Sequence, residues 1–133
     1  HFNLSLEKQT ERILRAMDHP YFSILAHPTG RKINQRAPYQ VDLTRIIYKA
    51  RERGCFLELN ANPKRLDLTD IYCQMAKEQS VLVSINSDAH SIDAYNDLEF
   101  GVGQARRGWL EKRDVLNTRP LAQMRKLLKQ TIK

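Results

Sequence analysis

Two histidines and an aspartate stand where predicted strands end, and their spacing is typical of a metal site. The apolar run 81–85 (VLVSI) is followed by Asp88 and His90, and a second apolar run, 22–26 (FSILA), is followed by His27. Residues i and i+2 of an extended chain point to the same face, so Asp88 and His90 can reach one point. Imidazole and carboxylate groups bind zinc, manganese and iron. The pattern therefore predicts a metal centre to which all three side chains contribute.

Each of these residues also has an ordinary structural interpretation. A single histidine such as His27 is more often a hydrogen-bonded residue of the fold than a ligand. Asp88 could instead cap the helix that follows, because carboxylates at that position accept backbone N–H groups. Glu58 stands in a strand that should be buried, where a carboxylate needs a partner. It would either orient a ligand histidine or pair with a helix lysine or arginine, and we favour the pairing slightly.

The elements that must position these residues alternate along the chain. Helical apolar spacing predicts helices over 5–17, from Asp42 to a left-handed cap at Gly54, and from about Asp67 to Ala76; apolar runs predict strands over 22–26, 55–60 and 81–86. Three such repeats indicate an α/β fold with parallel strands and crossover helices. Sites in these folds collect at the carboxyl ends of the strands, which is where the candidate ligands fall.

The order is looser after His90. Residues 91–98 read as a short helix or turn, 100–103 as a short strand entering a helix, and 111–116 as one or two helical turns. An amphipathic helix over 119–132 closes the chain, with its leucines, Met124 and Ile132 facing inward.

Composition limits the class of protein. The 133 residues suffice for one domain, and 41% hydrophobic with 28% charged residues is ordinary for a soluble globular protein. No stretch is long and apolar enough to cross a membrane, and no signal peptide is visible. Cys55 and Cys73 lack the spacing of a disulfide framework or zinc knuckle, so free thiols in a reducing cytoplasm are expected. Motifs of P-loop ATPases and of serine or cysteine hydrolases are absent.

The chain carries a net charge of +7 and has a pI near 9.6. That excess suits a polyanion such as nucleic acid, although a basic surface without a partner is an equally good interpretation. Cations gather in the segments that follow the apolar runs, and Arg31, Arg65 and Arg107 are the candidates for contacts with DNA phosphates.

Several segments resemble one known family, the polymerase and histidinol phosphatase (PHP) domain. They are 24–31 (ILAHPTGR), 58–68 (ELNANPKRLDL), 86–90 (NSDAH), 105–110 (ARRGWL) and 114–118 (DVLNT). The NSDAH segment is shared by many PHP proteins. The first and the last two segments are more specific to the version at the C-terminus of bacterial family X DNA polymerases, and the resemblance covers essentially the whole chain.

The resemblance implies that residues 1–133 are a single fragment, the C-terminal half of a distorted (β/α)7 TIM-like barrel. It assigns His27, Asp88 and His90 to a cluster of up to three Mn²⁺ or Zn²⁺ ions. It also implies a 3′–5′ exonuclease and 3′-end phosphatase of a DNA repair polymerase, in which metal-activated water hydrolyses the ester without a covalent enzyme intermediate. The expected partners are DNA 3′ ends, the upstream half of the barrel and a polymerase domain.

The sequence also departs from the family. The opening His-x-His motif, the other ligands and the first strands are expected upstream of His1, which would itself be the neighbour of a ligand. The fragment alone is therefore expected to be inactive, and its open sheet edge invites dimerisation. Two other functions stay open: a PHP-type phosphatase for a small ester such as histidinol phosphate or a nucleotide, and a degenerate, non-catalytic domain that binds DNA.

Overall fold

The computed structural model describes residues 3–133, so His1 and its predicted role lie outside the described residues. Helix and strand alternate three times, in the order α1 (Leu6–Met17), β1 (Ile24–Leu25), α2 (Leu43–Arg53), β2 (Phe56–Asn60), α3 (Asp70–Glu78) and β3 (Val83–Asn86). The sheet order is β1-β2-β3 and both pairs are parallel. The α/β class with parallel strands and crossovers is confirmed. The sheet of the described residues is open, so the barrel stays a prediction.

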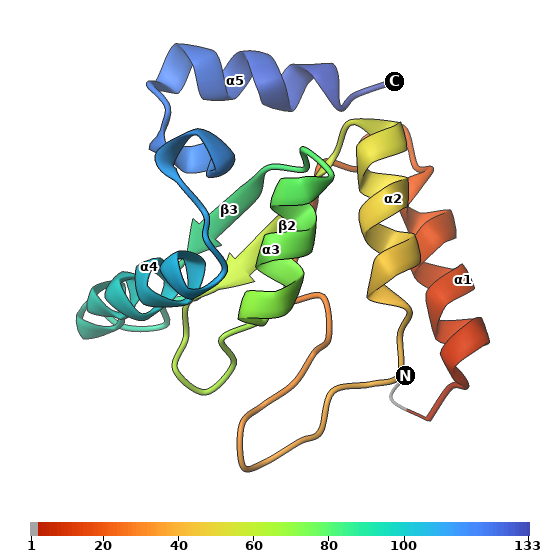
Figure 1. The fold of residues 1–133 in the computed structure, drawn as a ribbon, viewed down its shortest axis with the longest axis horizontal. Coiled ribbons are helices and arrows are strands. Elements are labelled where there is room, and N and C mark those ends of the chain that lie inside the picture. The colour runs from red at the N-terminus through yellow and green to blue at the C-terminus, as the bar shows by residue number, and fades with distance from the viewer. Residues whose placement is uncertain (1–2) are drawn as a thin grey trace.

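Local signals in the sequence explain where the first helices begin and end. The Ser5 hydroxyl accepts a hydrogen bond from the Lys8 N–H at 3.3 Å, and the Asp42 carboxylate caps α2 through the Arg45 N–H at 3.2 Å. Gly54 ends α2 with a φ of 70°, which a glycine adopts without strain. Helices α1 and α2 lie side by side, with α3 beside α2 (Figure 1).

The core lies between these helices and the sheet. Its largest fully buried apolar side chains are Met17, Ile46, Ile47, Leu57, Leu59, Leu68 and Leu116. Both cysteines are free, as the sequence predicts, and the structure shows that both are buried. No helix in residues 3–133 combines the length and the apolar character that crossing a membrane requires.

Two predicted elements are wrong. Helix α3 begins at Asp70 rather than near Asp67, because the Asp67 side chain is fully buried in contacts with another loop. Residues 100–103 are not a strand but part of α4 (Leu98–Arg107). Gly101 lies where this helix presses on the sheet: a Cβ there would be only 2.6 Å from both the Ala61 Cβ and the Ile85 Cγ2. This glycine therefore allows a close approach of the helix to the sheet.

The edge of the sheet beside β3 is covered by residues from the end of the chain. The Asn117 carboxamide accepts the Ile85 N–H at 3.1 Å and donates to the Ile85 carbonyl at 2.7 Å, as a neighbouring strand would. Val115 forms a parallel bridge with Val83. The 3₁₀ helices Lys112–Asp114 and Leu116–Thr118 belong to this region, and a third, Asp93–Asp97, lies between β3 and α4. Within residues 3–133, only the β1 side of the sheet is left as an open edge.

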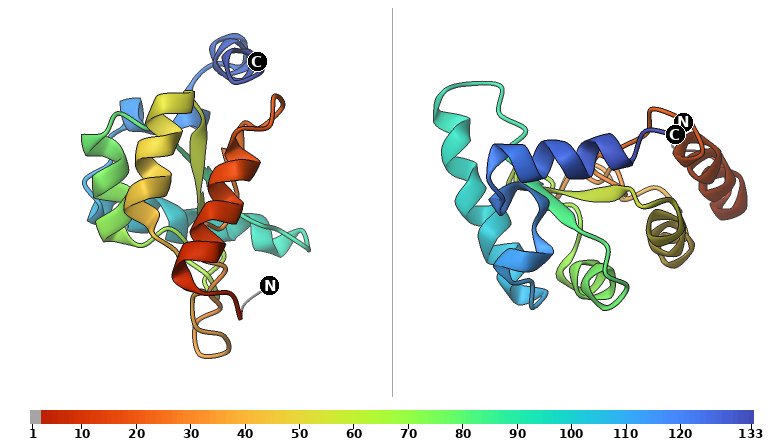
Figure 2. Two further views of the ribbon diagram at one scale, coloured as in Figure 1. Left: turned by 90° about the vertical axis from the view of Figure 1, so that its right-hand side faces the viewer. Right: turned by 90° about the horizontal axis from the view of Figure 1, so that it is seen from above.

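The closing helix, α5 (Leu121–Gln130), lies near the amino ends of β2 and β3, opposite the loops that follow the strands (Figures 1 and 2). None of its residues is buried, and Leu121 is 64% exposed. The prediction that its whole apolar face points inward is therefore wrong. The chain end is instead fixed beyond the helix, where the Thr131 and Ser23 hydroxyls are 2.6 Å apart and the Lys133 N–H donates to the Pro20 carbonyl at 2.9 Å.

Candidate site at the strand ends

A buried carboxylate joins the loop after β1 to the loop after β2. The Asp67 side chain is fully buried, and its Oδ2 accepts hydrogen bonds from the Thr29 N–H at 3.0 Å, the Gly30 N–H at 3.0 Å and the Thr29 hydroxyl at 2.9 Å. Burial raises the pKa of Asp67, and the hydrogen bonds from Thr29 oppose that rise. Asp67 thus serves to hold the two loops together.

Arg31 ties the same loops a second time. Its Nε donates to the Arg65 carbonyl at 2.7 Å, and its terminal NH2 group donates to the Leu66 carbonyl. We call Thr29–Arg31 together with Arg65–Asp67 the loop clamp. Because the Arg31 guanidinium donates to two backbone carbonyls, it holds the loop clamp together. Its contact with a phosphate stays a prediction.

Glu58 connects the ends of all three strands. It is 8% exposed; its Oε2 accepts the His27 N–H at 2.6 Å and its Oε1 accepts the Asn86 side-chain N–H at 3.0 Å. The favoured pairing with a helix lysine or arginine is wrong, because these amide donors take that place. The other predicted role, orientation of a ligand histidine, agrees better with the structure, because Glu58 positions His27 through its backbone N–H. The sequence analysis missed Asn86, whose place beside the Asp88–His90 pair was the available signal.

Asp88 and His90 are neighbours at the end of β3. The His90 Nδ1 lies 2.7 Å from the Asp88 backbone oxygen and 4.0 Å from the Asp88 Oδ1. A carbonyl oxygen can only accept, so the Nδ1 carries a proton, and in the neutral imidazole the Nε2 then keeps its lone pair. The His90 side chain is 84% exposed, which leaves that lone pair accessible. This tautomer is the one that a ligand histidine commonly takes when its second nitrogen donates to a carbonyl.

The Asp88 carboxylate is held by an arginine and caps no helix. The Arg65 Nε lies 3.3 Å from the Asp88 Oδ2, and no side-chain cap is formed at the 3₁₀ helix that follows. The alternative of Asp88 as a helix cap is therefore wrong. Arg65 stays close to the candidate site, and its second terminal nitrogen, NH1, is buried without a hydrogen-bond partner.

His27 is fixed through its backbone, while its ring is unengaged. Its N–H binds Glu58, and among residues 3–133 the imidazole has no hydrogen-bond partner. His27 and Asp88 both have positive φ, 28° and 55°, which is uncommon for residues other than glycine. Such conformations persist where surrounding contacts impose them, as the Glu58 contact does at His27.

The described residues do not by themselves make a complete ion site. Nowhere in residues 3–133 do three His, Cys, Asp or Glu side chains group closely enough to hold one ion. Asp88 and His90 lie together, whereas a shared site with His27 stays a prediction. The third predicted phosphate contact, Arg107, lies at the end of α4 with its NH2 group 3.7 Å from the Asp70 Oδ2.

The fold and the site define an α/β domain whose ionisable residues gather at the carboxyl ends of parallel strands, where such folds place their active sites. No protein-family model matches the chain. The chain is 44% identical, over 119 residues, to the DNA polymerase/3′-5′ exonuclease PolX of Bacillus subtilis, an alignment covering 90% of this chain and 21% of PolX. It is also 32% identical over 91 residues to a probable phosphatase of Caldanaerobacter subterraneus, and 30% identical over 91 residues to one of Thermoanaerobacter sp. strain X514.

These two alignments cover 64% of this chain and 34% and 35% of the phosphatases. The chain thus spans about a fifth of the length of PolX and about a third of the phosphatases. It belongs to the PHP family, as a C-terminal part of the domain in the form found in bacterial family X DNA polymerases.

Proposed function

We propose that the chain is part of a phosphoesterase domain that trims DNA 3′ ends, as a 3′–5′ exonuclease and 3′-end phosphatase of a DNA repair polymerase. The similarity to PolX over 90% of the chain is the observation that carries this proposal. In this proposal residues 1–133 form the C-terminal half of a (β/α)7 barrel in a cytoplasmic protein. The upstream half would pair along the open β1 edge, and a polymerase domain would belong to the same protein.

The proposed domain depends on Mn²⁺ or Zn²⁺, with up to three ions in the complete site. His27, Asp88 and His90 would be the ligands from this chain, and the remaining donors would come from outside the described residues. Support for this role is the free Nε2 of His90 beside the Asp88 carboxylate and the unengaged ring of His27. Bound divalent ions lower the pKa of a coordinated water and neutralise charge on phosphate oxygens.

The chain's own residues would hold and orient the substrate. Glu58 fixes the backbone of His27, and the loop clamp fixes the loop that carries Arg65. Arg65 brings a guanidinium beside Asp88. A guanidinium in that position can form charge-assisted hydrogen bonds with a phosphate oxygen. Its place beside Asp88 is what supports Arg65 as a phosphate contact, and Arg31 and Arg107 stay predicted contacts.

Removal of single ligands in the intact protein tests the proposal. His27→Ala and Asp88→Ala should abolish Mn²⁺-dependent removal of nucleotides from a 3′-labelled single strand and leave nucleotide incorporation largely unchanged. Asp93→Ala is the matched control, because this carboxylate is exposed and lies outside the site. Loss of trimming and incorporation together, in variants whose circular dichroism shows an intact fold, would contradict the division between the two activities.

A second candidate is the hydrolysis of a small phosphate ester, such as histidinol phosphate or a nucleotide. The similarity to probable phosphatases favours it. Values of kcat/KM for these esters and for a single-stranded oligonucleotide, measured on the intact protein, would separate the two. A degenerate domain that only binds DNA would contain no stoichiometric manganese or zinc, which metal analysis of the purified protein would reveal.

A further inference from the structure

The two loops beside the candidate site are strongly basic. Residues 28–41 and 61–66 together contain five cations and no carboxylate; the cations are Arg31, Lys32, Arg36, Lys64 and Arg65. The loop after β1 projects beyond the carboxyl ends of the strands (Figure 1). A basic surface at the mouth of a site is a place where an anionic chain can bind. Which of the five cations are available depends on their contacts.

The three guanidinium groups are already engaged. Arg31 donates to the carbonyls of the loop after β2, and Arg65 pairs with the Asp88 carboxylate. Arg36 donates to the Gly30 carbonyl through its Nε at 3.1 Å and its NH2 group at 2.8 Å. Because these contacts hold the loops in place, the arginines would have to break structural hydrogen bonds before binding elsewhere. The NH1 group of Arg65 is buried without a hydrogen-bond partner.

The two lysines differ from the arginines in this respect. Neither Lys32 nor Lys64 forms an ion pair with any carboxylate of residues 3–133. Their backbones are nevertheless held firmly. The Lys32 N–H donates to the Arg36 carbonyl at 2.9 Å, and the Ile33 N–H donates to the Lys64 carbonyl at 2.6 Å. Two ammonium groups without carboxylate partners therefore arise from adjacent, hydrogen-bonded turns of two different loops.

The location connects these lysines to the candidate site. Lys64 immediately precedes Arg65, whose Nε is 3.3 Å from the Asp88 Oδ2. Lys32 lies on the wall of an open groove of about 420 Å³ that residues 31–38 line. An anion bound by both lysines would lie beside the site but outside it. A substrate that contacts both the candidate site at Asp88 and the two lysines must therefore extend beyond the phosphate that would be hydrolysed at Asp88.

We propose that Lys32 and Lys64 form a second phosphate-binding position, which holds the backbone of a single-stranded polynucleotide at least one phosphate away from the ester at Asp88. This inference deepens the proposed function, because it makes a polynucleotide and not a small ester the substrate of the same site. Lysine suits the role, since its ammonium is a point charge that binds phosphates in many orientations. A backbone that slides through the site needs such tolerance.

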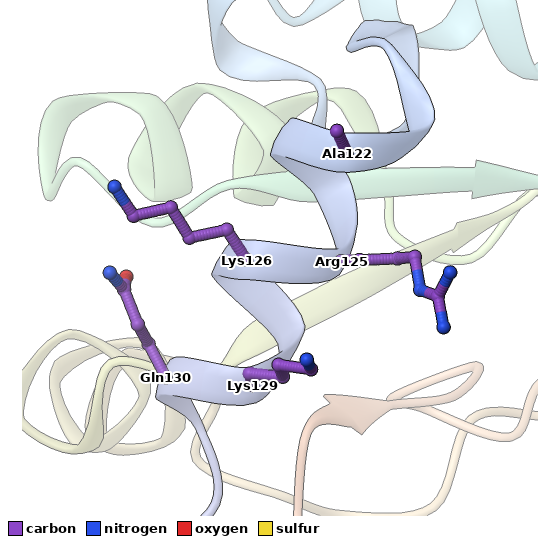
Figure 3. Close-up of a pocket in the computed structure, with 5 residues that line it drawn as sticks. All are labelled: Ala122, Arg125, Lys126, Lys129 and Gln130. Atoms are coloured by element: carbon purple, nitrogen blue, oxygen red, sulfur yellow. The ribbon is translucent and has the colours of Figure 1, made fainter.

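Helix α5 is the other basic surface, and its geometry differs. Arg125, Lys126 and Lys129 line an open groove of about 640 Å³ together with Ala122 and Gln130. In Figure 3 the Arg125 side chain points to one side of the helix and those of Lys126 and Gln130 to the other. The cations therefore diverge, at the end of the molecule opposite the site. They provide a matched control of equal charge.

The test measures the salt dependence of binding in the intact protein. A fluorescein-labelled oligodeoxythymidine is titrated by anisotropy between 50 and 300 mM KCl for wild type, K32A/K64A and K126A/K129A, in the presence of EDTA. The slope of log K against log salt is negative, and each lost phosphate contact on a single strand reduces its magnitude by about 0.7. The magnitude should therefore fall by about 1.4 in K32A/K64A and stay unchanged in K126A/K129A. An unchanged slope in K32A/K64A, or an equal fall in both variants, would overturn the proposal.

Hydrolysis distinguishes this inference from the proposed function. K32A/K64A should raise the KM for a single-stranded oligonucleotide and leave the hydrolysis of bis-p-nitrophenyl phosphate unchanged, because that ester is too short to reach the lysines. If wild type cleaves neither substrate while the salt slope still falls in K32A/K64A, the proposed function fails and the lysine site stands. If wild type trims DNA and K32A/K64A has wild-type slope and KM, the lysine site fails alone. Thermal unfolding midpoints show whether both variants are folded.

Discussion

Replacing Asp67 with alanine tests whether the loop clamp stabilises the fold as well as the site. The change leaves the N–H groups of Thr29 and Gly30, both buried, without an acceptor. An unsatisfied buried donor costs about 1–3 kcal/mol, so the two together cost about 2–6 kcal/mol. Removing a buried carboxylate returns part of this, because its own desolvation is unfavourable. We expect the free energy of unfolding to fall by about 2–4 kcal/mol.

Urea unfolding followed by circular dichroism gives the free energy of unfolding of wild type, Asp67→Ala and Asp67→Asn. The asparagine keeps one acceptor oxygen, so it should lose roughly half as much as the alanine. Asp93→Ala is the control for loss of a carboxylate, and it should stay within about 0.5 kcal/mol of wild type. Amide exchange should accelerate at Thr29 and Gly30 in Asp67→Ala. A value for Asp67→Ala as close to wild type as the control would refute the reasoning.

The pH dependence of the free energy of unfolding provides a second test of the role of Asp67. Its pKa is raised in the folded state, chiefly by burial, so the folded protein holds this proton more tightly than the unfolded chain. The stability from this group is then fully present below its unfolded pKa of about 3.9 and is lost as pH rises through the folded pKa. Wild type should lose stability relative to Asp67→Asn over that interval. If the free energy of unfolding of wild type instead rose with pH relative to that of Asp67→Asn, the assigned direction of the pKa shift would be contradicted.

Two further changes examine how the end of the chain packs on the sheet. Gly101→Ala forces a Cβ to within 2.6 Å of Ala61 and Ile85, which should destabilise the protein by about 1–3 kcal/mol. Gly103→Ala is the control: it has open space around it and should stabilise α4 by up to about 1 kcal/mol. Equal effects of the two changes on urea unfolding would show that the close approach is absent. Asn117→Leu removes both partners of the Ile85 peptide groups and should cost about 2–4 kcal/mol, and a variant as stable as wild type would mean that the β3 edge is satisfied in another way.

The features that the sequence predicted correctly are those with local causes. Ser5 and Asp42 cap their helices through N–H groups three residues away, and Gly54 ends α2 in a conformation that glycine takes without strain. The repeat of helix and strand indicated the parallel sheet, because parallel neighbours need a crossover. Each of these signals lies within a few residues of the feature it specifies, so a single sequence contains all of it.

The features that the sequence did not reveal depend on contacts between distant residues. Asp67 resembled the start of a helix, but its partners are 37 and 38 residues away, in the loop after β1. Gly101 lies in a segment that the sequence predicts to be a short strand, and its role depends on the side chains it meets. Asn117 completes the edge of β3 from 32 residues away. No spacing rule within one segment could have found these pairs.

The cations at the strand ends show the same distinction in chemical terms. Sequence analysis can place Arg31, Lys32, Lys64 and Arg65 beside a site, but it cannot tell which of them the fold itself uses. A guanidinium presents several N–H groups in a fixed plane, which suits it to bind backbone carbonyls and a carboxylate at once. Arg31 and Arg65 are used in this way, each bonded within or beside the loop clamp. The arginines thus help to give the loops their shape. In the site proposed above, the two lysines bind a mobile anion, because a single ammonium charge binds phosphates in many orientations.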